Sequence, residues 1–110
     1  MRALVTGATG FLGNCLTLEL RRRGWEVVCA VRGEVESQDR AIRCAALDLD
    51  RPESFDLDGA GSIDVLIHLA AAMPTRGGEP GCTRFLLENV CATARLLASA
   101  KKLGVETFVY

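Results

Sequence analysis

The chain has 110 residues, of which 49% are hydrophobic and 25% charged, and its formal net charge is −1 at pH 7. This length gives one domain with a single buried core, and the composition is that of a globular protein. A net charge so close to zero argues against a nucleic-acid partner. No apolar run reaches the roughly 18 residues of a membrane span, and no signal peptide is evident, so we expect a cytoplasmic protein without a membrane partner.

Five cysteines are spread along the chain without a Cys-x-x-Cys pair. Their odd number and wide spacing fit neither a zinc site nor a disulfide framework. We expect the cysteines to be small buried hydrophobic residues of a protein in a reducing compartment. We expect no metal site. The five are Cys15, Cys29, Cys44, Cys82 and Cys91.

The chain begins with an apolar run that leads into a glycine-rich turn, MRALVTGATGFLG. Gly7 allows a sharp turn after the strand, Gly10 lets a phosphate approach bare backbone, and Gly13 lets the next helix pack closely. Free amides around Phe11 and Leu12, at the positive end of the helix dipole, suit a pyrophosphate. The order strand, turn, helix therefore predicts a dinucleotide site, with a plain surface loop as the alternative.

The spacing Gly-x-x-Gly-x-x-Gly in TGATGFLG resembles the cofactor loop of the extended short-chain dehydrogenase/reductases. This group includes NAD-dependent epimerases/dehydratases and dihydroflavonol-reductase-like enzymes, and the resemblance runs the whole length of the chain. It implies that the loop, Thr9 included, binds a nicotinamide dinucleotide. It also implies a small-molecule substrate, such as a nucleotide sugar.

The segment 11–23 predicts a helix with an apolar face, which ends at Gly24 as a left-handed cap. That face consists of Leu12, Cys15, Leu16 and Leu20. The arginines at 21–23 fall in the last turn, where cations offset the helix dipole. The apolar run 25–31 then predicts a central parallel strand.

Arg32 follows this second strand, at the place where a dinucleotide fold meets the adenosine ribose. NAD sites usually place an acid here, whereas a guanidinium can pair with the extra phosphate of NADP. Arg32 therefore favours NADP over NAD. Glu34 and Glu36 could pair with Arg32 or replace it, and a solvated arginine without a ligand is the alternative.

A polar segment, 33–40, predicts a short or irregular crossover before a third strand at 41–47. The resemblance implies that Asp48 and Leu49, at the end of that strand, hold the adenine ring. Asp48 could instead cap the turn near Pro52, and Asp50 could supply either role.

The run 63–72 predicts a fourth strand that breaks into small residues, which leave room for ribose and nicotinamide. Leu69, Ala70 and Ala71 match the cofactor lining of the family that the chain resembles. His68, the single histidine, invites an acid/base assignment, but the resemblance implies a packing role.

A loop at 73–78 of the kind that lines substrate pockets precedes the longest predicted helix, 80–103. Its apolar stripe consists of Leu86, Leu87, Val90, Ala94, Leu97 and Ala98. The resemblance implies that Asn89 supports the cofactor site, with a surface asparagine as the alternative. It also implies a homodimer through this helix.

A fifth strand at 105–110 completes the order of a doubly wound α/β fold, a Rossmann-type parallel sheet with strand order 3-2-1-4-5. Residues 1–110 are then one NAD(P)-binding domain. The resemblance implies that the catalytic Tyr-x-x-x-Lys lies beyond Tyr110, so these residues alone are expected to be inactive. We expect the dinucleotide-binding part of an epimerase, dehydratase or ketone reductase. A non-catalytic NADP sensor or scaffold and an interaction module without a nucleotide are the alternatives.

Overall fold

A parallel sheet forms the centre of the structure, a computed structural model that describes residues 1–33, 42–49, 51, 57, 60–73 and 82–110. Within these residues the sheet has five strands in the predicted order, β3-β2-β1-β4-β5. The strands are β1 (Arg2–Thr6), β2 (Glu26–Val31), β3 (Ile42–Ala46), β4 (Val65–His68) and β5 (Thr107–Val109). The order reverses between β1 and β4, where open α/β sheets bind their ligands.

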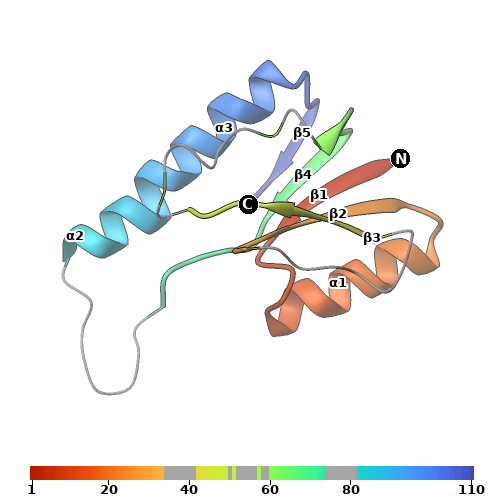
Figure 1. Ribbon diagram of the computed structural model, residues 1–110, viewed down its shortest axis with the longest axis horizontal. Coiled ribbons are helices and arrows are strands. Elements are labelled where there is room, and N and C mark those ends of the chain that lie inside the picture. Colours follow the sequence, from red (N-terminus) through yellow and green to blue (C-terminus); the bar gives the residue numbers. More distant parts are fainter. Residues whose placement is uncertain (34–41, 50, 52–56, 58–59, 74–81) are drawn as a thin grey trace.

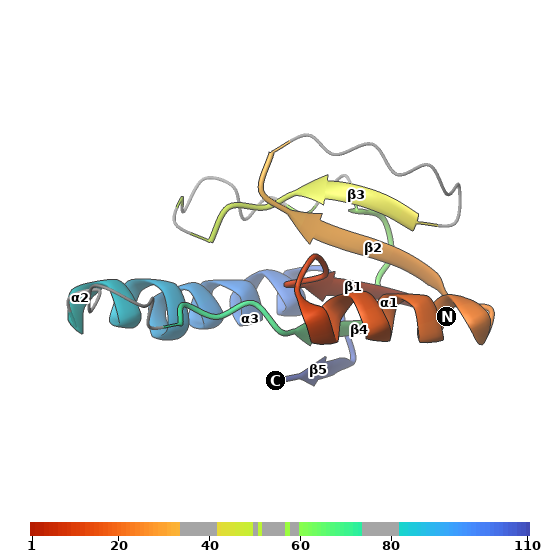
Figure 2. The same ribbon diagram turned by 90° about the horizontal axis from the view of Figure 1, so that it is seen from below.

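Helices cover the two faces of the sheet (Figure 1). The helix α1 (Phe11–Arg22) lies on one face. The other face carries a continuous helical segment made of α2 (Cys82–Phe85), the π-helical turn η3 (Leu86–Cys91) and α3 (Ala92–Lys102). Figure 2 shows the strands from the side, with β3 and β5 at the two edges. The arrangement confirms the predicted doubly wound architecture.

Alternate residues of β1, β2 and β4 point into two separate cores, as expected for a sheet that is covered on both faces. Ala3 and Val5 of β1 pack in the cluster on the α1 side, whereas Leu4 packs in the cluster on the α3 side. All three are fully buried. Residues 3–5 of β1 are therefore all apolar, and the strand ends in a polar residue, Thr6.

The buried face of α1 agrees with the predicted one only in part, because Leu20 is buried and Leu16 packs against the same core, but Leu12 and Cys15 do not. Gly13, Thr17 and Leu20 are buried, whereas Leu12 is 62% exposed and Cys15 is also exposed. The cause is that the helix packs with Gly13 against the glycine-rich turn. This orientation of the helix places Leu12 and Cys15 on its outer side. The prediction that the cysteines are buried is therefore wrong for Cys15.

The predicted apolar stripe of the long helix is also on the wrong face. The inner face instead buries Ala92, Leu96 and Ala100 against the sheet. Small alanines allow the helix backbone to approach the strands closely, so the bulkier stripe faces outward. The outward members are Leu86, Leu87, Val90, Ala94, Leu97 and Ala98, all exposed.

The positive φ of 80° at Gly24 confirms the left-handed cap after α1. Several predicted features lie outside the described residues and are not tested. These are Glu34, Glu36, Asp50, Pro52 and the segment 74–81. No helix in the described ranges is long and apolar enough to cross a bilayer.

Candidate dinucleotide site

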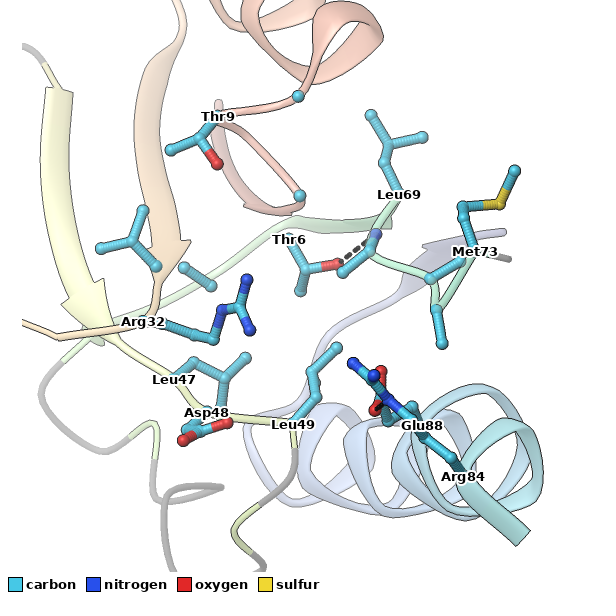
Figure 3. Close-up of a pocket in the computed structure, with 17 residues that line it drawn as sticks. Thr6, Thr9, Arg32, Leu47, Asp48, Leu49, Leu69, Met73, Arg84 and Glu88 are labelled. Carbon is cyan, nitrogen blue, oxygen red and sulfur yellow. Dashed lines mark hydrogen bonds and ion pairs between the residues drawn. The ribbon is translucent and has the colours of Figure 1, made fainter. Parts of the chain in front are cut away.

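A pocket of about 460 Å³ lies where β1, β2, β3 and β4 end, and this size is typical of small-molecule sites. The glycine-rich turn and the long helix complete its walls (Figure 3). The lining residues are Thr6, Gly7, Thr9, Gly10, Ala30, Val31, Arg32, Leu47, Asp48, Leu49, Leu69, Ala70, Ala71, Ala72, Met73, Arg84 and Glu88. Four strand ends therefore contribute to one pocket, as the fold class requires.

Three glycines shape the turn between β1 and α1, each for a different reason. Gly7 has φ of 70°, and a Cβ there would lie 2.7 Å from the amide nitrogen of Ala70. A Cβ at Gly13 would lie 2.1 Å from the carbonyl oxygen of Gly7, so no side chain fits. At Gly10 a Cβ would meet only the Gly7 oxygen, at 3.3 Å. Since Gly10 also lines the pocket, its open side is where a ligand can approach the backbone.

The first turn of α1 presents backbone amides without a competing anion. It contains no acidic residue, and Gly10 at its N-cap provides no side-chain hydrogen bond. The side chain of Phe11 is 91% exposed and that of Leu12 is 62% exposed, and neither lines the pocket. Any contribution of these two residues to a ligand therefore comes from their amides, which have no partner within the helix.

The ends of β2 and β3 bring Arg32 and Asp48 to the same side of the pocket. The Leu47 amide donates to the Val31 carbonyl oxygen at 2.7 Å, which extends the ladder between the two strands. Figure 3 shows the Arg32 guanidinium directed into the pocket above Asp48 and Leu49. A cation, a carboxylate and an apolar side chain therefore lie within one recess.

The segment 69–72 after β4 forms the opposite wall, and Asn89 fixes it from behind. The Ala72 amide donates to Asn89 Oδ1 at 2.6 Å, and Asn89 Nδ2 donates to the Ala72 carbonyl oxygen at 3.1 Å. Asn89 is partly buried and does not itself line the pocket. This pairing favours the predicted supporting role over the alternative of a surface asparagine.

His68 lies beneath this wall and is only 3% exposed. Its Nδ1 is 2.6 Å from Thr6 Oγ1, and its Nε2 is 2.9 Å from Thr93 Oγ1. Burial lowers the pKa of the imidazole below its usual 6.5, because the charged form loses its hydration. This placement agrees with a packing role.

Several lining residues were not among the predicted site residues. Thr6 ends β1, Met73 follows β4, and Arg84 and Glu88 form an ion pair four residues apart on the long helix. The spacing of Arg84 and Glu88 indicates a helical ion pair, but only the fold shows that this pair faces the pocket.

A family model described as "NAD dependent epimerase/dehydratase family" matches residues 3–110. A ketoreductase from Stigmatella aurantiaca, 4-hydroxy-2-methyl-3-oxo-4-farnesyl-3,4-dihydroquinoline-1-oxide ketoreductase, is 32% identical over 117 residues. This alignment covers 100% of this chain and 33% of the relative. The chain thus spans about a third of the length of the curated relatives it matches.

Two solved structures have the same fold. The UDP-glucose 4-epimerase of Thermus thermophilus in complex with NAD has a TM-score of 0.80 at 25% identity, covering 100% of this chain and 37% of that chain. MoeE5 in complex with UDP-glucuronic acid and NAD has a TM-score of 0.78 at 35% identity. That similarity covers 98% of this chain and 35% of MoeE5.

Proposed function

Because the chain belongs to the NAD dependent epimerase/dehydratase family, we propose that it forms the dinucleotide-binding part of an NAD(P)-dependent epimerase, dehydratase or ketone reductase. The observation that carries the proposal is the pocket itself, which joins a glycine-rich turn, a helix N-terminus and four strand ends. When bound, the nicotinamide of such a cofactor supplies hydride transfer, and the protein orients it.

The pyrophosphate is proposed to bind at the start of α1. Gly10 leaves space for it, and the amides of Phe11 and Leu12 offer donors at the positive end of the helix dipole. Thr9 lines the same part of the pocket and can add a hydroxyl donor. Gly7 and Gly13 act indirectly, because they allow the tight packing that shapes the turn.

The adenosine half is proposed to bind between Arg32, Asp48 and Leu49. Arg32 lines the pocket with its guanidinium directed into it, so we propose that it pairs with the extra phosphate of NADP. NADP is therefore the proposed cofactor and NAD the alternative. NAD is the dinucleotide in the complexes of the two similar structures. Asp48 can accept from the adenine amino group, and Leu49 can pack on the ring.

The nicotinamide half is proposed to lie along the wall made by Leu69, Ala70 and Ala71. These residues line the pocket, and the two alanines leave space beside the backbone. Asn89 supports this wall through its two hydrogen bonds to Ala72. The contribution of Asn89 to cofactor binding is therefore indirect.

The reaction of the whole protein and its substrate, a small molecule such as a nucleotide sugar, are part of the proposal. Residues 1–110 contain a single tyrosine, Tyr110, and no Tyr-x-x-x-Lys sequence, so we propose that they are inactive alone. We also propose a cytoplasmic homodimer. The outward stripe on the long helix supports the dimer, because exposed apolar patches commonly mark interfaces.

Calorimetric titration of the full-length protein with NADP and NAD tests the proposed function. We expect one dinucleotide per chain, and tighter binding of NADP. A reductase or epimerase assay then separates an enzyme from a dinucleotide sensor, which would bind but not turn over. A folded protein that binds neither dinucleotide would contradict the proposal.

A further inference from the structure

We propose that His68 is a positioning residue that fixes the pocket wall 69–72 as a neutral imidazole with its proton on Nε2. It does so at the centre of a directed chain of hydrogen bonds that runs from Ala70 to Asn89. The inference rests on the proposed function only in that the wall is taken to contact a dinucleotide.

The direction of the chain follows from what each group can donate. The Thr93 hydroxyl donates its single proton to the Asn89 carbonyl oxygen at 2.7 Å, because a carbonyl can only accept. The Thr93 oxygen must then accept from His68 Nε2, which lies 2.9 Å away. Nε2 therefore carries a proton.

The other side of the ring completes the assignment. A neutral imidazole with its proton on Nε2 has a free lone pair on Nδ1. That lone pair accepts from the Thr6 hydroxyl at 2.6 Å, and the Thr6 oxygen accepts from the Ala70 amide at 3.2 Å. Each donor in the sequence thus meets one acceptor. A second ring proton would reverse the Thr6 contact and place a charge at a site that is 3% exposed.

The series of hydrogen bonds also reaches the other end of the wall. Its last member, Asn89, binds both backbone groups of Ala72 through its side chain. Ala70 is thus held through Thr6 and Ala72 through Asn89, and the His68 ring joins these two supports. These hydrogen bonds connect β1, β4, η3 and α3, so we expect a displaced ring to shift the wall relative to the rest of the pocket.

The surroundings of the ring favour the neutral form. The rings of Phe108 and Tyr110 have centroids 6.3 and 5.6 Å from that of His68. Tyr110 is the titratable group seen against the ring among the described residues. In the described part of the chain, burial alone accounts for the lowered pKa of His68.

Nuclear magnetic resonance of the free full-length protein tests the tautomer without any ligand. Long-range ¹H–¹⁵N spectra of the ring, assigned by their loss in His68→Asn, are expected to show protonated Nε2 and unprotonated Nδ1 at neutral pH. A ring with its proton on Nδ1, or one charged at neutral pH, would overturn the proposal.

Two substitutions at Thr93 test the positioning role, because Thr93 does not line the pocket. Thr93→Val removes the hydroxyl at nearly constant shape, and Thr93→Ser keeps it. We expect Thr93→Val to shift the backbone amide signals of Ala70 and Ala72 and to raise the Kd for NADP about tenfold, roughly one hydrogen bond. Thr93→Ser should restore both. Loss of stability in Thr93→Val with unchanged wall signals and Kd would show a merely structural role and overturn the proposal.

A pH titration of the wild type keeps the proposal testable if Thr93→Val does not fold. The Ala70 and Ala72 amide signals should change with the same midpoint as the His68 ring, below pH 6.5. Different midpoints for the amide signals and the His68 ring would contradict the proposed series of hydrogen bonds. If the wild type binds no dinucleotide, the proposed function fails, whereas the ring and amide signals still decide the role of His68.

Discussion

The side chain of Asn89 pairs with both backbone polar groups of Ala72, 17 residues earlier in the chain. One carboxamide thereby satisfies an amide and a carbonyl at a place where the sheet has ended and no neighbouring strand can do so. The pairing explains how a polar side chain is accommodated on the side of the long helix that faces the sheet.

Replacing Asn89 by Ala should lower the free energy of unfolding by about 1–3 kcal/mol, because two partly buried backbone groups lose their partners. Urea denaturation of the two proteins measures the difference. Arg95→Ala is the matched control, since Arg95 lies on the same long helix, is exposed and is off the apolar stripe. It should change the stability by less than about 0.5 kcal/mol. Equal losses in both variants would show that the Asn89 pairing contributes little.

Replacing Arg32 by Ala should weaken binding of NADPH by about 1.5–3 kcal/mol and leave NADH nearly unaffected, because only NADPH has the phosphate that the guanidinium can pair with. Fluorescence titration with each cofactor measures both affinities. Arg95→Ala, at an exposed position of α3, controls for the loss of one positive charge. Similar losses for the two cofactors would argue against a preference for NADP.

Protonation of His68 should destabilise the fold on acidification. Its pKa in the folded protein is lowered by burial, so the unfolded chain binds the proton more readily. The stability that the neutral imidazole contributes is complete above pH 6.5, the usual pKa of histidine. It is lost as the pH falls from 6.5 toward the pKa of His68 in the folded protein. Urea denaturation from pH 7.5 to 5 measures it. His68→Asn should lack this part of the pH dependence, and an identical profile in the variant would contradict the assignment.

The outward stripe on the long helix leads to a prediction about assembly. Leu97→Asp should weaken self-association of the full-length protein, because a carboxylate would be buried in an apolar contact. Arg95→Asp, on the same helix but off the stripe, is the control. Sedimentation at several concentrations gives the molar mass. A Leu97→Asp protein with the mass and concentration dependence of the wild type would place the interface elsewhere.

The strand order and the glycine-rich turn could be predicted from sequence because their causes are local. Gly7 needs a left-handed backbone, and parallel strands joined by crossovers allow few orders. The inner faces of the helices could not be predicted in this way. Hydrophobic periodicity finds a stripe that includes Leu97, but it cannot tell whether that stripe meets the core or another surface. Small residues such as Ala92 lie in the core because of close packing, which only the fold reveals.

The candidate site likewise contains residues that the sequence could predict and residues that only the fold reveals. Nine of the predicted residues line the pocket, because each stands at a strand end or in the turn. They are Gly7, Thr9, Gly10, Arg32, Asp48, Leu49, Leu69, Ala70 and Ala71. Arg84 and Glu88 were missed because they come from a helix whose rotation the sequence left open. The links of His68 to Thr6 and Thr93 join residues up to 62 positions apart and carry no local pattern.

The central claim is that a dinucleotide binds across the turn at Gly10, and calorimetric titration of NADP into Gly10→Val tests it most directly. Gly10 has φ of −75° and ψ of 170°, which suit valine, and its Cβ would meet only the Gly7 oxygen, at 3.3 Å. We therefore expect the variant to fold after the Gly7 oxygen shifts by a few tenths of an ångström. Gly13→Ala, by contrast, should be strongly destabilised, since its Cβ would lie 2.1 Å from the same oxygen. We predict that Gly10→Val keeps the circular dichroism of the wild type and shows no measurable heat of NADP binding, whereas a folded Gly10→Val with wild-type affinity would contradict the proposed site.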